Sequence, residues 1–132
     1  YNDYSCRDMT LRPDAGRYEC GTLNTISIFG LRTAIDLTLE IGLARIGPAV
    51  LAAADRLAEG AMAKGYEILC PRTPETGSGI VSIRKPDLDA RMVTAELRRN
   101  GVTAALRQGW TRLSPHFYVG APEIEKVVDL LP

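Results

Sequence analysis

Residues 102–113 have the sequence VTAALRQGWTRL, which predicts a β-hairpin. Val102–Leu106 and Trp110–Leu113 are short runs typical of strands, and Gln108-Gly109 between them is typical of a tight turn. Two strands joined by so short a turn run antiparallel. The hairpin therefore predicts an antiparallel sheet at the centre of the fold.

Further strands and helices are predicted before and after the hairpin. The strands are Tyr66–Cys70, ended by Pro71, and Ile80–Arg84, closed by Pro86. The first predicted helix is residues 25–42, and a break near Gly42–Pro48 separates it from a second helix, which ends near Lys64 with Gly65 as its cap. A third helix runs from the N-cap Asp87 to Asn100, with Gly101 as its stop. Pro122 opens the last helix. This order predicts an α+β fold, in which helices pack on one face of a four-stranded, mainly antiparallel sheet.

Composition limits the class of protein. A chain of 132 residues with 45% hydrophobic and 24% charged residues suits one globular domain, and a net charge of zero gives no support to a nucleic-acid or membrane partner. Cys6, Cys20 and Cys70 show no metal-binding spacing, which predicts reduced thiols, no metal site and a cytoplasmic protein. The chain starts on Tyr1 without an initiator Met, so we expect it to be a piece of something longer. We expect residues 1–24 to be a lead-in and connecting segment, and residues 25–132 to be the folded domain with its connecting helix.

The first helix carries apolar residues on more than one side. Ile28, Leu31, Ile35 and Leu39 follow helical spacing along one face, whereas Ile26, Phe29 and Leu37 point elsewhere. A helix that is apolar on several sides is usually buried on several sides. We therefore expect this helix to carry more apolar surface than the domain covers by itself.

Two polar clusters are the candidates for chemistry. Residues 17–24, RYECGTLN, place Gly21-Thr22 just before the first helix, where a backbone N–H, a hydroxyl and a helix N-terminus suit an anion. An ordinary loop capped by Asn24 or Thr25 fits the same residues. Residues 107–118, RQGWTRLSPHFY, place Arg107 and Arg112 around the predicted turn, where a guanidinium grips a carboxylate. A charged hairpin rim fits these residues as well.

No catalytic constellation is evident in the residues themselves. His116 is the single histidine, and no cysteine nucleophile or serine triad partner lies near it in the sequence. A packed loop residue is the commoner role for a histidine in such a setting. The three lysines, Lys64, Lys85 and Lys126, are expected in ordinary exposed positions that do not suit Schiff-base chemistry.

Taken together and in order, the two clusters resemble the C-terminal part of class V aminotransferases. The similarity rests on RYECGTLN at 17–24, the helix from Gly30-Leu31 to Glu40-Ile41-Gly42, RLSPHFY at 112–118 and Glu123-Ile124. The chain is similar in these residues to pyridoxal-phosphate (PLP) enzymes of the cysteine desulfurase and isopenicillin N epimerase type. The resemblance implies that residues 25–132 are the small C-terminal α+β domain and its connecting helix, with a large N-terminal domain upstream.

The resemblance also implies roles for three residues. Gly21 and Thr22 would contact the cofactor phosphate across the interface of a homodimer, and Arg112 would hold the α-carboxylate of an amino-acid substrate. The lysine that binds PLP and the Asp that pairs with its pyridine nitrogen would lie upstream of residue 1. We therefore expect no catalytic residue in this chain, no bound PLP and no activity on its own.

The chain departs from desulfurases at residues 107–110, which lack the cysteine-bearing loop that accepts sulfur. An epimerase, lyase or transaminase reaction therefore fits as well as sulfur transfer, or better. The alternative function is a free-standing α+β binding module that uses Arg107 and Arg112 for a small carboxylate or a protein partner. The sequence upstream of Tyr1 would distinguish the two.

Overall fold

The computed structural model describes residues 10–19 and 21–132. The chain divides into two compact units, residues 1–37 and residues 38–132, which we describe separately. The elements in order are the 3₁₀ helix η1 (Ala15–Tyr18), α1 (Thr25–Ile41), α2 (Leu43–Ala63), β1 (Glu67–Ile68), β2 (Val81–Arg84), α3 (Ala90–Arg99), β3 (Ala105–Arg107), β4 (Trp110–Leu113) and α4 (Ala121–Asp129). The domain boundary expected between residues 24 and 25 stays a prediction.

The unit of residues 38–132 is built on a four-stranded sheet with strand order β1-β2-β4-β3. All three neighbouring pairs are antiparallel, which confirms the predicted fold class. The predicted hairpin is present, and Gln108 and Gly109 form its turn with positive φ angles of 47° and 82°. Two successive residues with positive φ match the twist of a two-residue hairpin.

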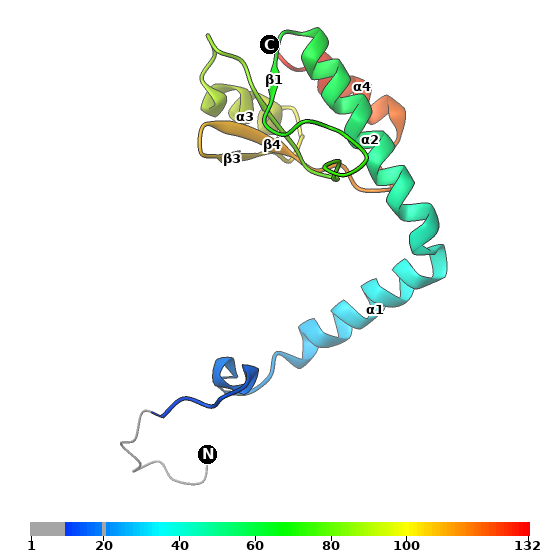
Figure 1. Ribbon diagram of the computed structural model, residues 1–132, viewed down its shortest axis with the longest axis vertical. Helices are drawn as coiled ribbons and strands as arrows, with labels where there is room; N and C mark the ends of the chain where they lie inside the picture. Colours follow the sequence, from blue (N-terminus) through cyan, green and yellow to red (C-terminus); the bar gives the residue numbers. More distant parts are fainter. Residues whose placement is uncertain (1–9, 20) are drawn as a thin grey trace. The chain divides into compact units, whose positions relative to one another are not determined.

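The helices α2 and α3 cover one face of this sheet, and α4 packs along α2 (Figure 1). Alternate residues of β2 and β4 point into the layer between sheet and helices, among them Val81, Ile83 and Leu113, which are 4% exposed or less. Small side chains on α2 bring the helix close to its neighbours. The core they form together is Ala54, Leu57, Ala58, Ala61, Tyr66, Val81, Ile83, Val93, Leu97, Ala104, Leu113, Ile124 and Leu131.

Glycines end both long helices of this layer, as predicted. Gly65 follows α2 with φ 83°, and the next residue, Tyr66, donates its N–H to the carbonyl of Ala61. Gly101 follows α3 with φ 79°, and Val102 donates to Leu97 in the same way. This is the Schellman arrangement, which satisfies carbonyls at the end of a helix.

The break between the first two helices is sharper than predicted. It is confined to Gly42, which has φ 92°, and α2 begins at the next residue. Pro48 lies inside α2, so the predicted break region near Gly42–Pro48 contains the break at only one end. Within the described residues, no single helix is long and apolar enough to cross a membrane, and α1 and α2 satisfy that test only as a pair broken at Gly42.

Three predicted boundaries were wrong by two residues or more. Asp89, rather than Asp87, caps α3, because its side chain accepts from the N–H of Arg91 at 2.8 Å. The first strand is only Glu67–Ile68, since the chain leaves the sheet before Pro71, which has no N–H to donate. The third strand starts at Ala105, because Val102 is used to end α3.

Candidate functional site

The face of the sheet away from α2 and α3 carries the candidate site. None of the strand residues on this face is buried. We call it the open face. It comprises Glu67, Ser82, Arg84, Ala105, Arg107, Trp110 and Arg112. Three of these seven residues are arginines and one is a carboxylate.

Arg112 lies near the end of β4, on the open face and away from the core. It stands directly across from Ser82 on β2 and from Ala105 on β3. The side chain is half-buried. Among the residues that the structure describes, no ion pair or hydrogen bond engages its guanidinium. An arginine held between two strands with its charge unpaired is suited to an anionic ligand.

Arg84 is in a different situation. Its Nε and Nη2 donate to Oε2 of Glu67 at 3.2 and 2.6 Å, and its Cζ lies 4.5 Å from the ring centroid of Trp110. Glu67, Arg84 and Trp110 occupy one row across the sheet. Glu67 pairs with Arg84, and the register of β2 on β4, continued by one residue, aligns Arg84 with Trp110. The charge of Arg84 is thus neutralised by a neighbour, and its flat guanidinium is fixed on the indole.

Arg107 closes the same row on the other side of Trp110. It pairs with Trp110 across the hairpin, and its Nη1 donates at 2.9 Å to the carbonyl of Leu106, its own neighbour in the chain. It is exposed and forms no ion pair with any described residue. Arg107 and Arg112 are therefore the two free positive charges of the open face.

Gly21 and Thr22 belong to the other unit, and both are exposed. They precede α1, and Asn24 caps that helix by accepting from the N–H of Ser27 at 3.1 Å, as the capped-loop interpretation predicts. A Cβ built on Gly21 meets no atom of the described residues beyond its chain neighbours within 4 Å, which leaves space beside its backbone for a ligand. The backbone N–H of Gly21, the hydroxyl of Thr22 and the N-terminus of α1 are groups of the kind that bind a phosphate. Cys20 and Cys6 lie outside the described residues.

The lysines are used to fix the end of the chain. Lys64 donates from Nζ to the carbonyls of Asp129 and Leu131, at 2.9 and 2.7 Å, so it is less free than the sequence predicts. Lys85 donates to the carbonyl of Pro132 at 3.2 Å and lies over the ring of Tyr66. Only Lys126 is exposed without such a role. No group of three or more His, Cys, Asp or Glu side chains suited to a metal occurs among the described residues.

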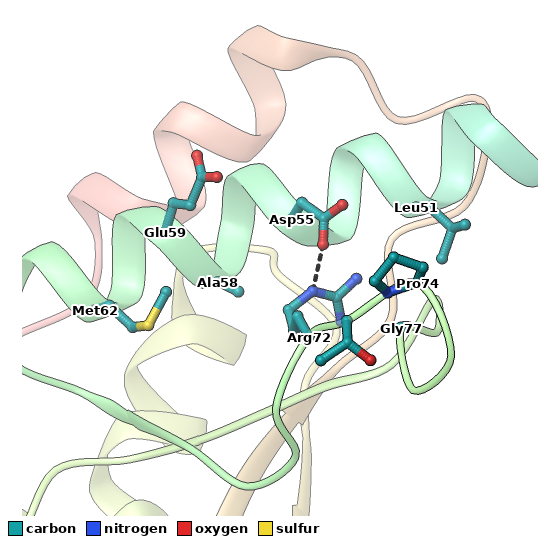
Figure 2. A pocket seen from close by; sticks show the side chains of 9 residues that line it. Leu51, Asp55, Ala58, Glu59, Met62, Arg72, Pro74 and Gly77 are labelled. Atoms are coloured by element: carbon teal, nitrogen blue, oxygen red, sulfur yellow. Dashed lines mark hydrogen bonds and ion pairs between the residues drawn. The ribbon is translucent and has the colours of Figure 1, made fainter.

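A groove of about 460 Å³ lies between α2 and the loop that follows β1 (Figure 2). Arg72 occupies it, with its side chain 13% exposed. Its Nε donates to Asp55 of α2, and its Nη2 donates to the carbonyl of Ser78 at 3.0 Å. Arg72 therefore joins the loop to the helix. In the same loop, a hydrogen bond from Thr73 lowers the pKa of Glu75. The charged side chains Arg72 and Glu75 are engaged in hydrogen bonds that hold the loop, so the groove is a weaker candidate for a ligand site than the open face.

The segment after β4 places three aromatic rings together. His116 stacks on Tyr118 at 4.6 Å between centroids and tilts against Phe117 at the same distance. His116 is exposed, and no described cysteine or serine donates to it or accepts from it. These ring contacts are with the next two residues of the chain, and the packed-loop role predicted for His116 stays a prediction.

Sequence reasoning missed Arg84 and Trp110 as part of this surface. The signal was available, because residues that alternate along a strand share a face. Ser82 and Arg84 alternate with the buried Val81 and Ile83. The pairing of β2 with β4 could not be predicted from the sequence, because α3 and β3 separate these strands along the chain. This pairing aligns Arg84 with Trp110.

Comparison with known proteins gives one family and several solved structures. The sequence matches the family described as Aminotransferase class-V over residues 1–119. No individual curated protein matches it. The apo structure of a cysteine desulfurase from Thermococcus onnurineus NA1 is similar, with 25% identity and a TM-score of 0.78 over 92% of this chain. A structure described as a NifS-like protein has a similar fold, with 20% identity and a TM-score of 0.70 over 83% of this chain. The chain spans about a third of either structure, 34% and 33%.

Proposed function

Because this chain belongs to the class V aminotransferase family, we propose that it is the C-terminal part of a PLP-dependent enzyme acting on an amino acid. The observation that carries the proposal is the family match over residues 1–119. The similarity of fold to one third of a cysteine desulfurase supports it. The remaining two thirds of such an enzyme would be the large N-terminal domain, which we propose as the partner of this one. A cytoplasmic homodimer is part of the same proposal.

Arg112 would bind the α-carboxylate of the substrate. Its guanidinium is unpaired among the described residues, and the sheet fixes its backbone between β2 and β3, so the side chain can bind an anion without breaking an existing ion pair. PLP, when bound, supplies an electron sink that weakens the bonds to the α-carbon. Arg112 would set the orientation of the amino acid and thereby decide which of those bonds reacts.

Gly21 and Thr22 would contribute to the cofactor phosphate. The open backbone of Gly21 and the hydroxyl of Thr22 stand at the N-terminal end of α1, where partial positive charge favours an anion. We propose that they reach the phosphate of the partner subunit in a homodimer. They are too few to hold PLP alone, because hydrogen bonds add only about 0.5–1.5 kcal/mol each and association has its own entropic cost.

The role of Arg112 is tested in the longer enzyme. We expect Arg112→Ala to raise KM for the amino acid roughly ten- to a hundredfold, since loss of a hydrogen bond to a charged group costs about 1.5–3 kcal/mol. The absorbance of bound PLP should be unchanged. Arg91→Ala is the matched control, because Arg91 is an exposed arginine of α3, the helix that covers the opposite face. Unchanged kinetics in Arg112→Ala would contradict the assignment.

The cross-subunit contact has a separate test by complementation. Thr22→Ala and Arg112→Ala subunits are each expected to be impaired. If Thr22 serves the partner's site, a mixed dimer contains one site with both residues intact and regains activity. If Thr22 serves its own subunit, both sites of the mixed dimer remain defective, and mixing restores nothing.

The chain alone is expected to form no specific PLP adduct. Lys64 and Lys85 donate to backbone carbonyls, and Lys126 is exposed, so no described lysine stands in a site that would activate its amine. The measurement is incubation with PLP, reduction with borohydride and mass spectrometry of the protein. A single stoichiometric adduct at one lysine would place the reactive amine in this chain and oppose the proposal.

The alternative of a free-standing carboxylate-binding module uses the same open face. It draws support from the fact that residues 38–132 enclose a core of their own. The reading frame upstream of Tyr1 distinguishes the two. A large α/β domain with a lysine after an apolar strand favours the enzyme, and a start codon just before Tyr1 favours the module.

A further inference from the structure

We propose that the open face binds a small ligand with two anionic groups, one held by Arg112 and the other by Arg107. The inference rests on the proposed function for the role of Arg112 and adds a second binding position. In the enzyme, it predicts a substrate whose side chain carries an anionic group, such as a dicarboxylic amino acid. A neutral side chain would leave Arg107 without a partner.

Arg107 and Arg112 are near neighbours on adjacent strands of the open face. Arg107 lies directly across from Trp110, and Arg112 is two residues further along β4 on the same face. The Cα atoms of such diagonal neighbours in an antiparallel pair lie roughly 7–8 Å apart. Flexible arginine side chains at this spacing can both reach a molecule whose carboxylates are separated by two or three carbon atoms.

The balance of charge on the open face agrees with two anionic groups. Its strands carry three arginines and a single carboxylate, Glu67, and this carboxylate is taken by Arg84 through two hydrogen bonds. Arg107 and Arg112 remain, and neither forms an ion pair with a described residue. Two like charges this close repel each other. A dianion placed between them removes that repulsion, whereas a monoanion neutralises only one.

Arg84 and Trp110 shape the site without binding the ligand. The indole lies in the same row as Arg107, and the guanidinium of Arg84 stacks on it at 4.5 Å. This contact covers one face of the indole, so that face is not free to stack with a base. With a net charge of zero in the chain, the arrangement favours a small dianion over a nucleic acid.

The test uses Trp110 as a reporter, since it is the single tryptophan of the chain. The 132-residue protein is titrated with glutarate and with butyrate at constant ionic strength, and indole fluorescence is followed. Glutarate has two carboxylates and butyrate has one on a chain of similar length. We expect glutarate to bind roughly tenfold more tightly, because a second charge-assisted contact is formed.

Three variants assign the effect to residues. Arg107→Gln should bring glutarate to the affinity of butyrate, and Arg112→Gln should weaken both ligands. Arg91→Gln, with the same loss of charge on α3, should change neither. Circular dichroism establishes that each variant is folded.

The outcomes separate this inference from the proposed function. A preference for glutarate that survives Arg107→Gln overturns the second binding position. Equal binding of the two ligands by the unaltered protein, or binding of neither, also overturns it. The role of Arg112 in the enzyme is measured by KM for the amino acid, so it stands or falls independently of these titrations.

Discussion

At the scale of single residues, Thr94 and Thr111 form the buried polar contact of the core. Their hydroxyl oxygens are 3.0 Å apart, and Thr111 also donates to the carbonyl of Ala90 at 3.1 Å. Thr111→Val leaves the hydroxyl of Thr94 without this partner, which should lower the free energy of unfolding by about 1–3 kcal/mol. The double variant Thr94→Val with Thr111→Val should recover much of the loss, because both polar groups are gone. Urea unfolding measures both effects, and equal losses in single and double variants would contradict this account.

Tyr66 should make stability depend on alkaline pH. Burial raises the pKa of its phenol from the ordinary 10.0, and the hydroxyl donates to the carbonyl of Pro132 at 3.0 Å. Because the folded-state pKa is the higher one, the contribution to stability is complete below pH 10 and is lost as pH rises through the folded-state pKa. Tyr66→Phe removes a hydrogen bond worth about 0.5–1.5 kcal/mol. The difference in unfolding free energy between the two proteins should therefore shrink above pH 10, and a constant difference would contradict the assignment.

Residue-scale prediction from sequence succeeded where one local rule decides the outcome. Gly65, Gly101 and Gly109 were predicted at the ends of helices and in the hairpin turn because positive φ strongly favours glycine. The cap of α3 was wrong because Asp87 and Asp89 both satisfy the local rule. The choice between the two aspartates depends on the turn that follows β2, in which the N–H of Leu88 donates to the carbonyl of Lys85. It also depends on where β2 ends.

At the scale of elements, Gly60 sets how closely α2 and α4 pack. A Cβ built on Gly60 would lie 2.5 Å and 2.9 Å from the two methyl carbons of Val128 on α4. We expect Gly60→Ala to lower the free energy of unfolding by about 1–3 kcal/mol through overpacking, although alanine is the better helix former. Gly60→Ala with Val128→Ala should relieve the clash.

Gly30 gives the control for this prediction. It lies inside α1, and a Cβ built on it meets no atom within 4 Å. Gly30→Ala should increase helicity by circular dichroism and should not destabilise the protein. Destabilisation of similar size by both alanine substitutions would mean that the contact with Val128 is not the cause.

Elements were predicted from sequence better than their ends. Each of the four strands and four α-helices was expected in the right order, because apolar spacing and turn residues are local signals. Strand ends depend on partners distant in the sequence. Tyr66 was assigned to the first strand, but its N–H is used to end α2 instead.

At the scale of the whole molecule, α1 carries apolar surface that nothing in the described chain buries. Ile26, Phe29 and Leu31 are 85%, 69% and 62% exposed, and no residue of α1 is buried. A large apolar surface of this kind promotes association. We expect the isolated chain to self-associate with rising concentration in sedimentation velocity. We propose that the large domain and a partner subunit cover this helix in the longer enzyme.

Substitution distinguishes α1 from the rest of the surface. Phe29→Glu with Leu31→Glu should reduce association, whereas Met92→Glu, at a residue 64% exposed on α3, should not. A monomeric chain at high concentration would contradict the prediction.

The family was predictable from sequence because its two motifs keep their order and spacing. The arrangement of the site was less so. Gly21 and Thr22 fall in one compact unit and Arg112 in the other, and a motif does not reveal how separate units meet. The row formed by Glu67, Arg84, Trp110 and Arg107 required the sheet register, which no local pattern specifies.

The strand order has a consequence for the time course of folding. The strands β3 and β4 close over a two-residue turn, whereas β2 and β4 must join across α3, with partners such as Ser82 and Arg112 about thirty residues apart. Local closure is fast and long-range closure is slow, so the hairpin should form before β2 docks. Because the guanidinium of Arg84 reaches Trp110 only after docking, the part of the indole fluorescence change that comes from this contact, followed in a stopped-flow experiment, would time the docking of β2 and not the formation of the hairpin.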